Sequence, residues 1–338
     1  MACATRWTPG CVTDKPTGPG PGPGSCQLTL ILVVTRYILR RVLWLIPVLV
    51  FVSLITFTLM HITPGGPWDK EKPLSAQVVA NLNARYNLDK PAWQQYLLYM
   101  GNAVRGDLGP SYTYQDRSVT QIILGGLPNT ASLGLFAAIV AIFVGVPLGI
   151  IAATRQNSAV DYAALAFGTV FASVPSFVLG FVLIIIFALT LHLVPTSGWG
   201  KPESYVLPVL TLGLNQAALL TRVTRASVLD VNRQDYMRTA RAKGLQEFLL
   251  IRRHLLKNAL IPVVTVIGPI LAFLLVGSLI VESIFSIPGI GRLLVQGIGQ
   301  RDYSLIMGTT LLYAFVIAVL NLIVDVLYGF IDPRITYR

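Results

Sequence analysis

Residues 42–60 read VLWLIPVLVFVSLITFTLM and contain no charged side chain. A helix rises about 1.5 Å per residue, so a segment of this length crosses a hydrocarbon layer about 30 Å thick. Further uncharged windows follow at residues 118–154, 162–200, 204–221, 258–281 and 303–324. Backbone polar groups must be bonded internally in lipid, and none of these windows alternates polar with apolar residues. The sequence therefore predicts an all-α membrane protein with six transmembrane helices, not a β-barrel.

The overall composition also indicates a membrane protein. Hydrophobic residues make up 54% and charged residues 12% of the 338 residues, whereas soluble domains carry roughly 25% charged residues. Disulfide scaffolds, disordered proteins and ordinary cytosolic enzymes are excluded on this ground. The three cysteines lie near the N-terminus without metal-ligand spacing, and neither an HExxH nor a P-loop motif occurs. We therefore predict no catalytic residue, no metal site and no cofactor bound by this chain.

The net charge of +11 is unevenly distributed between the two sides of the predicted membrane. With the N-terminus in the cytoplasm, inner segments hold fifteen basic and five acidic residues, whereas outer segments hold nine basic and seven acidic residues. Lysine and arginine favour the cytoplasmic side, so both termini are expected to be cytoplasmic. The positive charge thus reflects membrane topology, and no nucleic-acid partner is predicted.

The chain divides into a tail, a first span, an outer loop and a larger membrane domain. Residues 18–24 read GPGPGPG, which suits neither helix nor strand, so residues 1–34 are predicted to be a disordered tail or a mis-assigned start. The functional chain is then expected to begin near Val34 or Thr35. The remaining boundaries are a first transmembrane helix at 35–61, an extracytoplasmic loop at 62–126, a membrane domain at 127–329 with spans near 130–153, 163–190, 205–222, 259–283 and 306–329, and a cytoplasmic tail at 330–338.

The outer loop is too long to be only a connection. Ser75 suits the N-cap of an amphipathic helix that ends at Arg85, and Pro91 suits the start of a second helix from Ala92 to about Val104. Two interpretations stay open: the loop is a passive lid on the outer surface, or it is a docking surface for a soluble partner.

A second informative loop lies on the cytoplasmic side, between residues 222 and 257. Its segment DYMRTARAKGL at 235–245 predicts a short helix, because Asp235 suits the N-terminus and Lys243 the C-terminus. Gly244 then suits a left-handed cap. A basic helix at this place could simply lie on anionic lipid.

This segment resembles the EAA loop of ABC importer permeases. More broadly, the chain from Val34 to Arg338 resembles the B-type permease subunit of dipeptide and oligopeptide ABC importers. The motifs that carry the resemblance occur in one order: TRYILRR at 35–41, GDLG at 106–109, LPNT at 127–130, VESIFSIPGIG at 281–291 and DPR at 332–334. The Glu-Ala-Ala positions hold Arg238, Thr239 and Ala240 here, and Gly244 lies farther from Pro262 than in the short general motif. Both departures look like the peptide branch of the family.

The resemblance implies a type I ABC importer permease fold over 127–329 in a multi-pass protein of the bacterial inner membrane. It also implies partners: a second homologous permease subunit, two cytoplasmic ABC ATPase subunits that use the ATP, and an extracytoplasmic substrate-binding protein. Residues 235–250 would be the helix that couples this chain to an ATPase. The residues carried over to that role are Asp235, Arg238, Thr239, Ala240, Arg241, Gly244 and Leu245. The expected cargo is di- or oligopeptides, with nickel complexes or oligosaccharides as the alternative in the same class.

Polar side chains inside predicted spans are rare and therefore informative. Glu282, Asn215 and Gln216 are candidates for the pore or its gate. The alternative for Glu282 is a local partner at the membrane interface, and the alternative for the two amides is a hydrogen bond to a neighbouring helix. An ion-coupled secondary transporter would need buried ionisable residues and inverted repeats, and an intramembrane enzyme would need a catalytic set. The sequence offers little for either.

Overall fold

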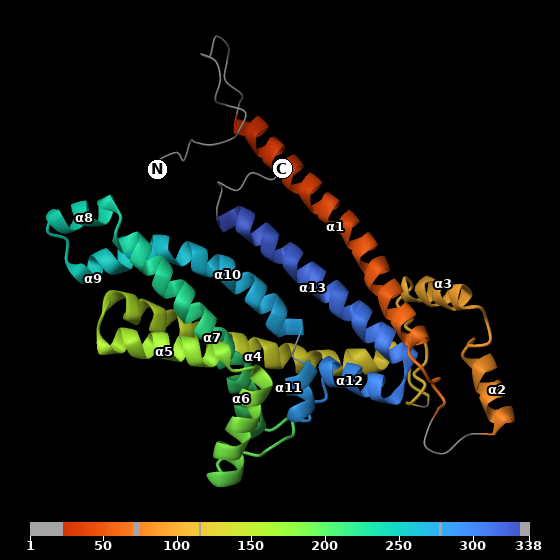
Figure 1. Cartoon of the computed structure of the whole chain (residues 1–338). Coiled ribbons are helices and arrows are strands. Elements are labelled where there is room, and N and C mark those ends of the chain that lie inside the picture. The colour runs from red at the N-terminus through yellow and green to blue at the C-terminus, as the bar shows by residue number, and fades with distance from the viewer. Residues whose placement is uncertain (1–22, 70–74, 115, 277–278, 332–338) are drawn as a thin grey trace.

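The computed structural model describes residues 23–69, 75–114, 116–276 and 279–331, and within these ranges the chain is predominantly helical (Figure 1). The described residues form no strand, although an isolated bridge joins Pro110 to Ser118. The all-α prediction is confirmed. The elements are α1 (Pro23–Ile62), α2 (Ala76–Arg85), α3 (Ala92–Ala103), α4 (Val119–Thr154), α5 (Ala159–Ser173), α6 (Ser176–Leu183), the π-helix η1 (Ile184–Thr190), α7 (Pro202–Asn232), α8 (Asp235–Ala242), α9 (Glu247–Leu250), the π-helix η2 (Ile251–Leu255), α10 (Leu256–Val276), α11 (Leu279–Ile284), α12 (Ile290–Gln300) and α13 (Tyr303–Ile331).

Five helices in the described part of the chain are long and apolar enough to cross a membrane, and a sixth crossing results if α5, α6 and η1 count as one broken span. These five candidates cover residues 39–62, 119–154, 202–232, 303–324 and 247–284, and the last runs across residues 277–278, which lie outside the described part. They lie where the uncharged windows of the sequence predict spans. The tail expected at 1–34 begins outside the described residues, but α1 already starts at Pro23, so residues 23–34 are helical and not an irregular tail. Residues 332–338 of the expected C-terminal tail also lie outside the described part.

Two spans extend well beyond their apolar windows. The Ser118 hydroxyl accepts a hydrogen bond from the backbone N–H of Gln121 at 3.2 Å, which fixes the start of α4 before the expected residue 130. The added turns bury Val119 and Ile123 against α12 and α13. At its other end α7 continues past residue 222, where Val228 packs with the loop that follows. Helix ends are thus set by packing outside the lipid as well as by apolar length.

The third predicted span is not one straight helix. The chain bends by 105° between α5 and the α6–η1 segment, and Figure 1 shows α6 standing out from the bundle. Val174 is extended (φ −82°, ψ 121°) and Pro175 follows it. Proline lacks an N–H and disfavours helical geometry in the residue before it, so the helix ends there. The expectation of a continuous span over 163–190 is corrected accordingly.

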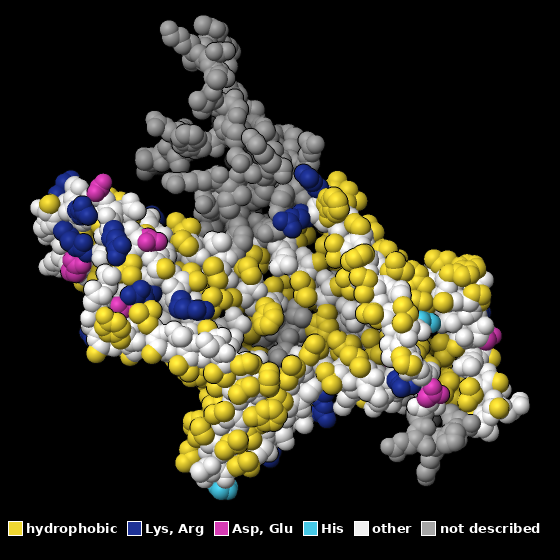
Figure 2. All heavy atoms as spheres, in the orientation of Figure 1, with side chains coloured by type: hydrophobic (Ala, Val, Ile, Leu, Met, Phe, Trp, Pro, Cys, Tyr) yellow, Lys and Arg dark blue, Asp and Glu magenta, His cyan; other side chains and the backbone are white. Residues whose placement is uncertain are grey.

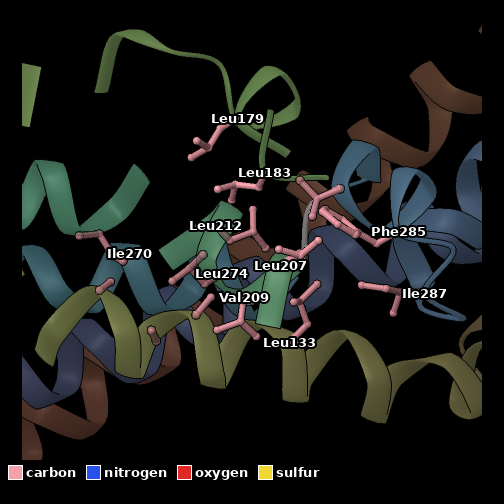
Figure 3. Packing of buried hydrophobic residues seen from close by; sticks show 14 of the residues in the cluster. Leu133, Leu179, Leu183, Leu207, Val209, Leu212, Ile270, Leu274, Phe285 and Ile287 are labelled. Atoms are coloured by element: carbon pink, nitrogen blue, oxygen red, sulfur yellow. The ribbon is translucent and has the colours of Figure 1, made fainter. Parts of the chain in front are cut away.

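The core forms where α4 and α7 pack closely along their lengths. A Cβ added at Gly145 would lie 2.6 Å from the carbonyl oxygen of Ala217, and one at Gly149 would lie 2.6 Å from Cβ of Thr224. These glycines let the two backbones approach, as small residues do between membrane helices. Leucines from α4, α6, α7 and α10 then fill the centre together with Phe285 (Figure 3).

The outer loop contains both expected helices, as α2 and α3 (Figure 1). Ser75 occupies the N-cap position of α2, but its side chain makes no capping hydrogen bond. The GDLG motif folds back on the start of α4: the Gly109 carbonyl accepts from the Val119 N–H at 2.9 Å. Thr120 completes this contact by donating to the Gly106 carbonyl at 3.0 Å.

Candidate functional site

The loop between α7 and α10 contains the predicted short helix. It appears as α8, which begins at Asp235 and ends at Ala242, with Lys243 as the C-cap residue. Gly244 follows with φ +77°, in the left-handed region that favours glycine. A Cβ at Gly244 would meet no atom within 4 Å, so backbone conformation and not crowding explains this glycine.

One face of α8 is anchored in the chain's own core. Met237 is completely buried and Ala240 nearly so, and both belong to a cluster with Val228 and Leu250. The half-buried Leu245 packs against the same cluster. The sequence prediction missed Met237 as an anchor, although its spacing of three residues from Ala240 is the helical signal for a shared face. Ala240 and Leu245 thus act on the inner side of the loop.

The opposite face of α8 is exposed and polar. The side chains of Asp235 and Arg238 are 98% and 75% exposed and lie 3.9 Å apart, and Thr239 is exposed beside them. Figure 2 shows basic side chains gathered at this end of the molecule, over α8 and α9. This face has free polar groups that a partner protein could contact.

Arg241 was expected among the residues that couple this chain to an ATPase, but its side chain makes contacts within the chain. Its guanidinium lies 3.0 Å from Oε1 of Glu247 and donates a 2.7 Å hydrogen bond to Oδ1 of Asn232. It therefore ties α8 to the end of α7 and to the start of α9. Arg241 stabilises the shape of the loop from within this chain.

Glu282 lies in α11, at the C-terminal end of the fifth span, and is completely buried. Its Oε1 accepts a 2.9 Å hydrogen bond from Oγ1 of Thr130, and its Oε2 accepts one from the Arg292 N–H at 3.2 Å. The Thr130 hydroxyl in turn accepts from the Ile290 N–H at 2.9 Å. Gly289 and Gly291 lie against the carboxylate, where a Cβ would come within 3 Å of Oε2. Thr130 and Arg292 are thus local partners of Glu282, as the alternative to a pore role expects.

The side-chain amides of Asn215 and Gln216, both in α7, differ in their hydrogen bonding. Asn215 donates from Nδ2 to the carbonyl oxygens of Phe171, at 2.9 Å, and Val174, at 3.4 Å. These carbonyls are left without helical partners by the break before Pro175, so Asn215 caps the bend. Gln216 is half-exposed, and its side chain makes no hydrogen bond within the described part of the chain.

Two buried aspartates, which the sequence analysis did not single out, also hold distant parts of the chain together. Asp161 at the start of α5 is buried and pairs with Arg225 of α7, through two hydrogen bonds of 2.6 and 2.8 Å. Asp302 is completely buried before α13, where its carboxylate accepts from the N–H groups of Tyr112, Thr113 and Leu305 and from the Ser111 hydroxyl. A lone aspartate next to an uncharged window gave no sequence signal for these partners, which lie far away in the chain.

Comparison with known protein families identifies the family of this chain. The model described as "Binding-protein-dependent transport system inner membrane component" matches residues 145–337, and the model of the N-terminal part of such components matches residues 34–134. The chain belongs to this transport family. Its members are membrane permease subunits of ABC transporters, which are non-catalytic, and this permease is a multi-pass protein of the inner membrane.

Individual relatives agree with this placement. The permease is 41% identical over 300 residues to the dipeptide transport system permease protein DppB of Bacillus subtilis. The matched region covers 89% of this chain and 97% of the relative. The permease is 40% identical over 304 residues to the oligopeptide transport system permease protein OppB of Salmonella typhimurium, covering 89% and 99%. It is also 41% identical over 305 residues to the glutathione transport system permease protein GsiC of Escherichia coli O6:H1, covering 90% and 99%. The resemblance to peptide-importer permeases is confirmed.

Solved structures confirm the type I fold. A chain of the MetNI methionine ABC transporter in an inward-facing conformation matches with a TM-score of 0.51 at 19% identity, covering 63% of this permease and 97% of that chain. A chain of an amino acid ABC transporter with histidines matches with a TM-score of 0.50 at 17% identity, covering 62% and 94%. Among the described residues of this permease, no group of three or more histidine, cysteine or acidic side chains could hold a metal ion.

Proposed function

We propose that this permease forms half of the pore of an ATP-driven importer for di- or oligopeptides. Relatives at about 40% identity carry dipeptide, oligopeptide and glutathione transport in their names. Glutathione is itself a tripeptide, so all three names describe short peptides. Nickel complexes or oligosaccharides are the alternative cargo within the same class of permease.

The single observation that carries the coupling role is the two-sided construction of α8. Its inner face, with Met237, is fixed in the core, while its outer face presents Asp235, Arg238 and Thr239 to solvent. A helix held in this way transmits a displacement to the spans as a rigid body instead of bending. ATP-driven closure of two docked ATPases then moves both α8 helices, and the spans rock between inward and outward access.

The partners follow from what this chain lacks. It has no P-loop, so the ATP is bound and hydrolysed by two separate cytoplasmic ATPase subunits. The span at 39–62 is only 6% buried within the chain, which leaves its apolar side chains for lipid and for a second homologous permease. A soluble binding protein delivers the cargo from outside, and the outer loop with α2 and α3 is either its docking surface or a lid on the pore.

The proposed orientation places α8 and both termini in the cytoplasm. The loop between α7 and α10 is rich in arginine and lysine, and such residues favour the inner side of the membrane. Cysteines introduced at Lys243 and at Gly101 test this topology through labelling with a membrane-impermeant maleimide. We expect Gly101→Cys to be labelled from outside and Lys243→Cys only after the membrane is opened.

The function itself is tested by transport. The permease is purified in mild detergent from its native host, and the proteins that accompany it are identified by mass spectrometry. The recovered complex is then placed in liposomes with its binding protein, and uptake of radiolabelled trialanine is measured with and without ATP. Uptake that requires ATP supports the importer, whereas uptake driven by an ion gradient without ATP would favour the secondary transporter.

A further inference from the structure

Helix α3 turns apolar side chains away from the rest of the chain. Residues spaced by three or four positions share one face of a helix, and four apolar residues of α3 and its C-cap do so: Trp93, Leu97, Met100 and Val104. We call this face the apolar stripe. Trp93, Leu97 and Val104 are 63%, 59% and 85% exposed. Figure 2 shows hydrophobic side chains gathered over α3 and along α1.

The opposite face of α3 contacts the protein and includes polar groups. Gln95 donates from Nε2 to the carbonyl oxygen of Lys90 at 2.8 Å, and its Oε1 lies 3.3 Å from Nε2 of His61 in α1. Tyr99 packs against the buried Met60 on the same side. An amphipathic helix on a protein surface in water has the reverse pattern, with its apolar face toward the core and its polar face outward. The outward position of the apolar stripe therefore favours an apolar medium around it.

Helix α3 meets α1 at a depth that lies within the first span. Oη of Tyr96 lies 2.8 Å from Oγ of Ser53 and 3.4 Å from the carbonyl oxygen of Val50. Both α1 residues belong to the uncharged window at 42–60. Ser53 precedes the last residue of α1, Ile62, by about 14 Å of helix rise. A tyrosine that reaches this depth brings its own helix to the boundary of the hydrocarbon layer.

The sequence of α3 suits that boundary. Residues 91–104 contain no charged side chain, and charged residues flank them as Lys90 and Arg105. Tryptophan, here Trp93, is enriched where hydrocarbon meets lipid headgroups. An amphipathic helix in that plane buries its apolar face about 5–10 Å deep, and the rest of its circumference stays in contact with headgroups and water. The exposed Gly101 lies beside the apolar stripe, so its labelling from the aqueous phase is still expected.

We propose that the apolar stripe of α3 is inserted in the lipid leaflet next to the C-terminal half of α1, where it anchors the loop between the first two spans to the membrane. The stripe continues the lipid-facing surface of α1, whose span is only 6% buried. On the other face of α3, Tyr99 packs with Ile306 and Met307 of α13, so the anchor also holds the start of α13. The partner of this face is thus lipid and not a soluble protein. This inference goes beyond the proposed function, which leaves the contact of the loop open.

Spin-label accessibility tests the insertion. The permease is purified with the proteins that accompany it and placed in nanodiscs. Its three cysteines are replaced by alanine, and one nitroxide is attached at Leu97→Cys or Val104→Cys. Collision rates are measured with oxygen, which concentrates in hydrocarbon, and with a polar nickel chelate, which stays in water. Matched labels at Leu54→Cys, on the exposed side of the α1 span, and at Asn81→Cys, on the exposed side of α2, give the lipid and water references.

The ratio of oxygen to chelate collisions separates the possible neighbours of the stripe. We expect the ratio at Leu97 and Val104 to equal that at Leu54 and to be roughly tenfold higher than that at Asn81, because the apolar face lies in hydrocarbon. A ratio like that of Asn81 at either site places the stripe in water and overturns the proposal. Low collision rates with both reagents mean that a protein covers the stripe, which overturns it as well. Transport is not measured, so failure leaves the importer function untouched.

Tryptophan fluorescence provides a second measurement that needs no introduced cysteine. Lipids brominated on the upper part of the acyl chain quench tryptophans that contact them. Trp93→Phe removes the tryptophan of the stripe, and we expect a loss of the quenched fraction of the fluorescence. Trp68→Phe is the matched control, because Trp68 belongs to the same loop but is only 9% exposed, and it should leave the quenched fraction unchanged. Equal quenched fractions in Trp93→Phe and the natural protein contradict the proposal.

Discussion

The two sides of this permease use charged residues in opposite ways. In the loop between α7 and α10, Asp235 and Arg238 of α8 are 98% and 75% exposed and touch each other only at 3.9 Å. At the other ends of these spans, Glu282 and Asp302 are completely buried. Together their carboxylates accept hydrogen bonds from Thr130, Arg292, Ser111, Tyr112, Thr113 and Leu305.

This difference separates residues that serve a partner from residues that serve the fold. Burying a carboxylate costs free energy unless hydrogen bonds replace its water, so a buried and fully bonded carboxylate fixes local structure. An exposed charge keeps its hydrating water, so it costs the fold little and stays available to another protein.

The largest effect is expected from Gly244→Val. A β-branched residue is strained at φ +77°, so the chain would leave α8 in another direction and the helix would lose its place. We expect ATP-dependent uptake to be lost while the protein is still inserted in the membrane at normal levels. Uptake in liposomes and the amount of membrane-inserted protein are the measurements.

The control for this variant is Gly106→Val on the outer side. Gly106 has φ +82°, and its Cβ would also meet no atom within 4 Å, so the local strain is matched. We expect this variant to keep most of its uptake. If both variants lose uptake equally, strain in general and not the position of α8 is responsible, and natural uptake by Gly244→Val would contradict the coupling role.

The second effect concerns the outer side. Asp302→Ala leaves the N–H groups of Tyr112, Thr113 and Leu305 without their acceptor. We expect the free energy of unfolding to fall by about 3 kcal/mol, because each buried unpaired donor is costly. Chemical denaturation in detergent measures it, and Asp235→Ala on α8 is the control that should change stability by less than about 0.5 kcal/mol.

A smaller effect is expected from Glu282→Gln. The amide keeps one acceptor but places an N–H₂ group against either the Thr130 hydroxyl or the Arg292 N–H. The free energy of unfolding should fall by about 1–2 kcal/mol, and uptake should fall less than in Gly244→Val. Complete loss of uptake at normal stability would instead indicate that Glu282 acts in the pore.

The smallest effect distinguishes two arginines of α8. Arg241 contacts Glu247 and Asn232, whereas Arg238 extends into solvent. Arg241→Ala should lower stability by no more than about 1 kcal/mol, since the contact is partly exposed, and Arg238→Ala should leave stability unchanged. If Arg238 contacts an ATPase, its variant lowers the ATPase activity stimulated by cargo, which is measured as phosphate release.

The sequence by itself determined the features that depend on neighbouring residues. Uncharged windows long enough for a bilayer predicted the spans, and the acidic start, basic end and glycine of 235–244 predicted α8. Ser75 and Pro91 correctly marked the starts of α2 and α3. In each case the signal lies within one or two helical turns, where propensity, capping and hydrophobicity act.

Only the tertiary structure decided what depends on distant partners. The bend at Val174 is capped by Asn215, forty-one residues away along the chain, and Asp302 bonds a loop 190 residues earlier at Tyr112. A charged or amide residue has the same local sequence signal whether it is exposed or bonded in the interior. Its role is fixed by which atoms the packing of the helices brings within hydrogen-bonding distance, and hydrophobic periodicity carries no information about that pairing.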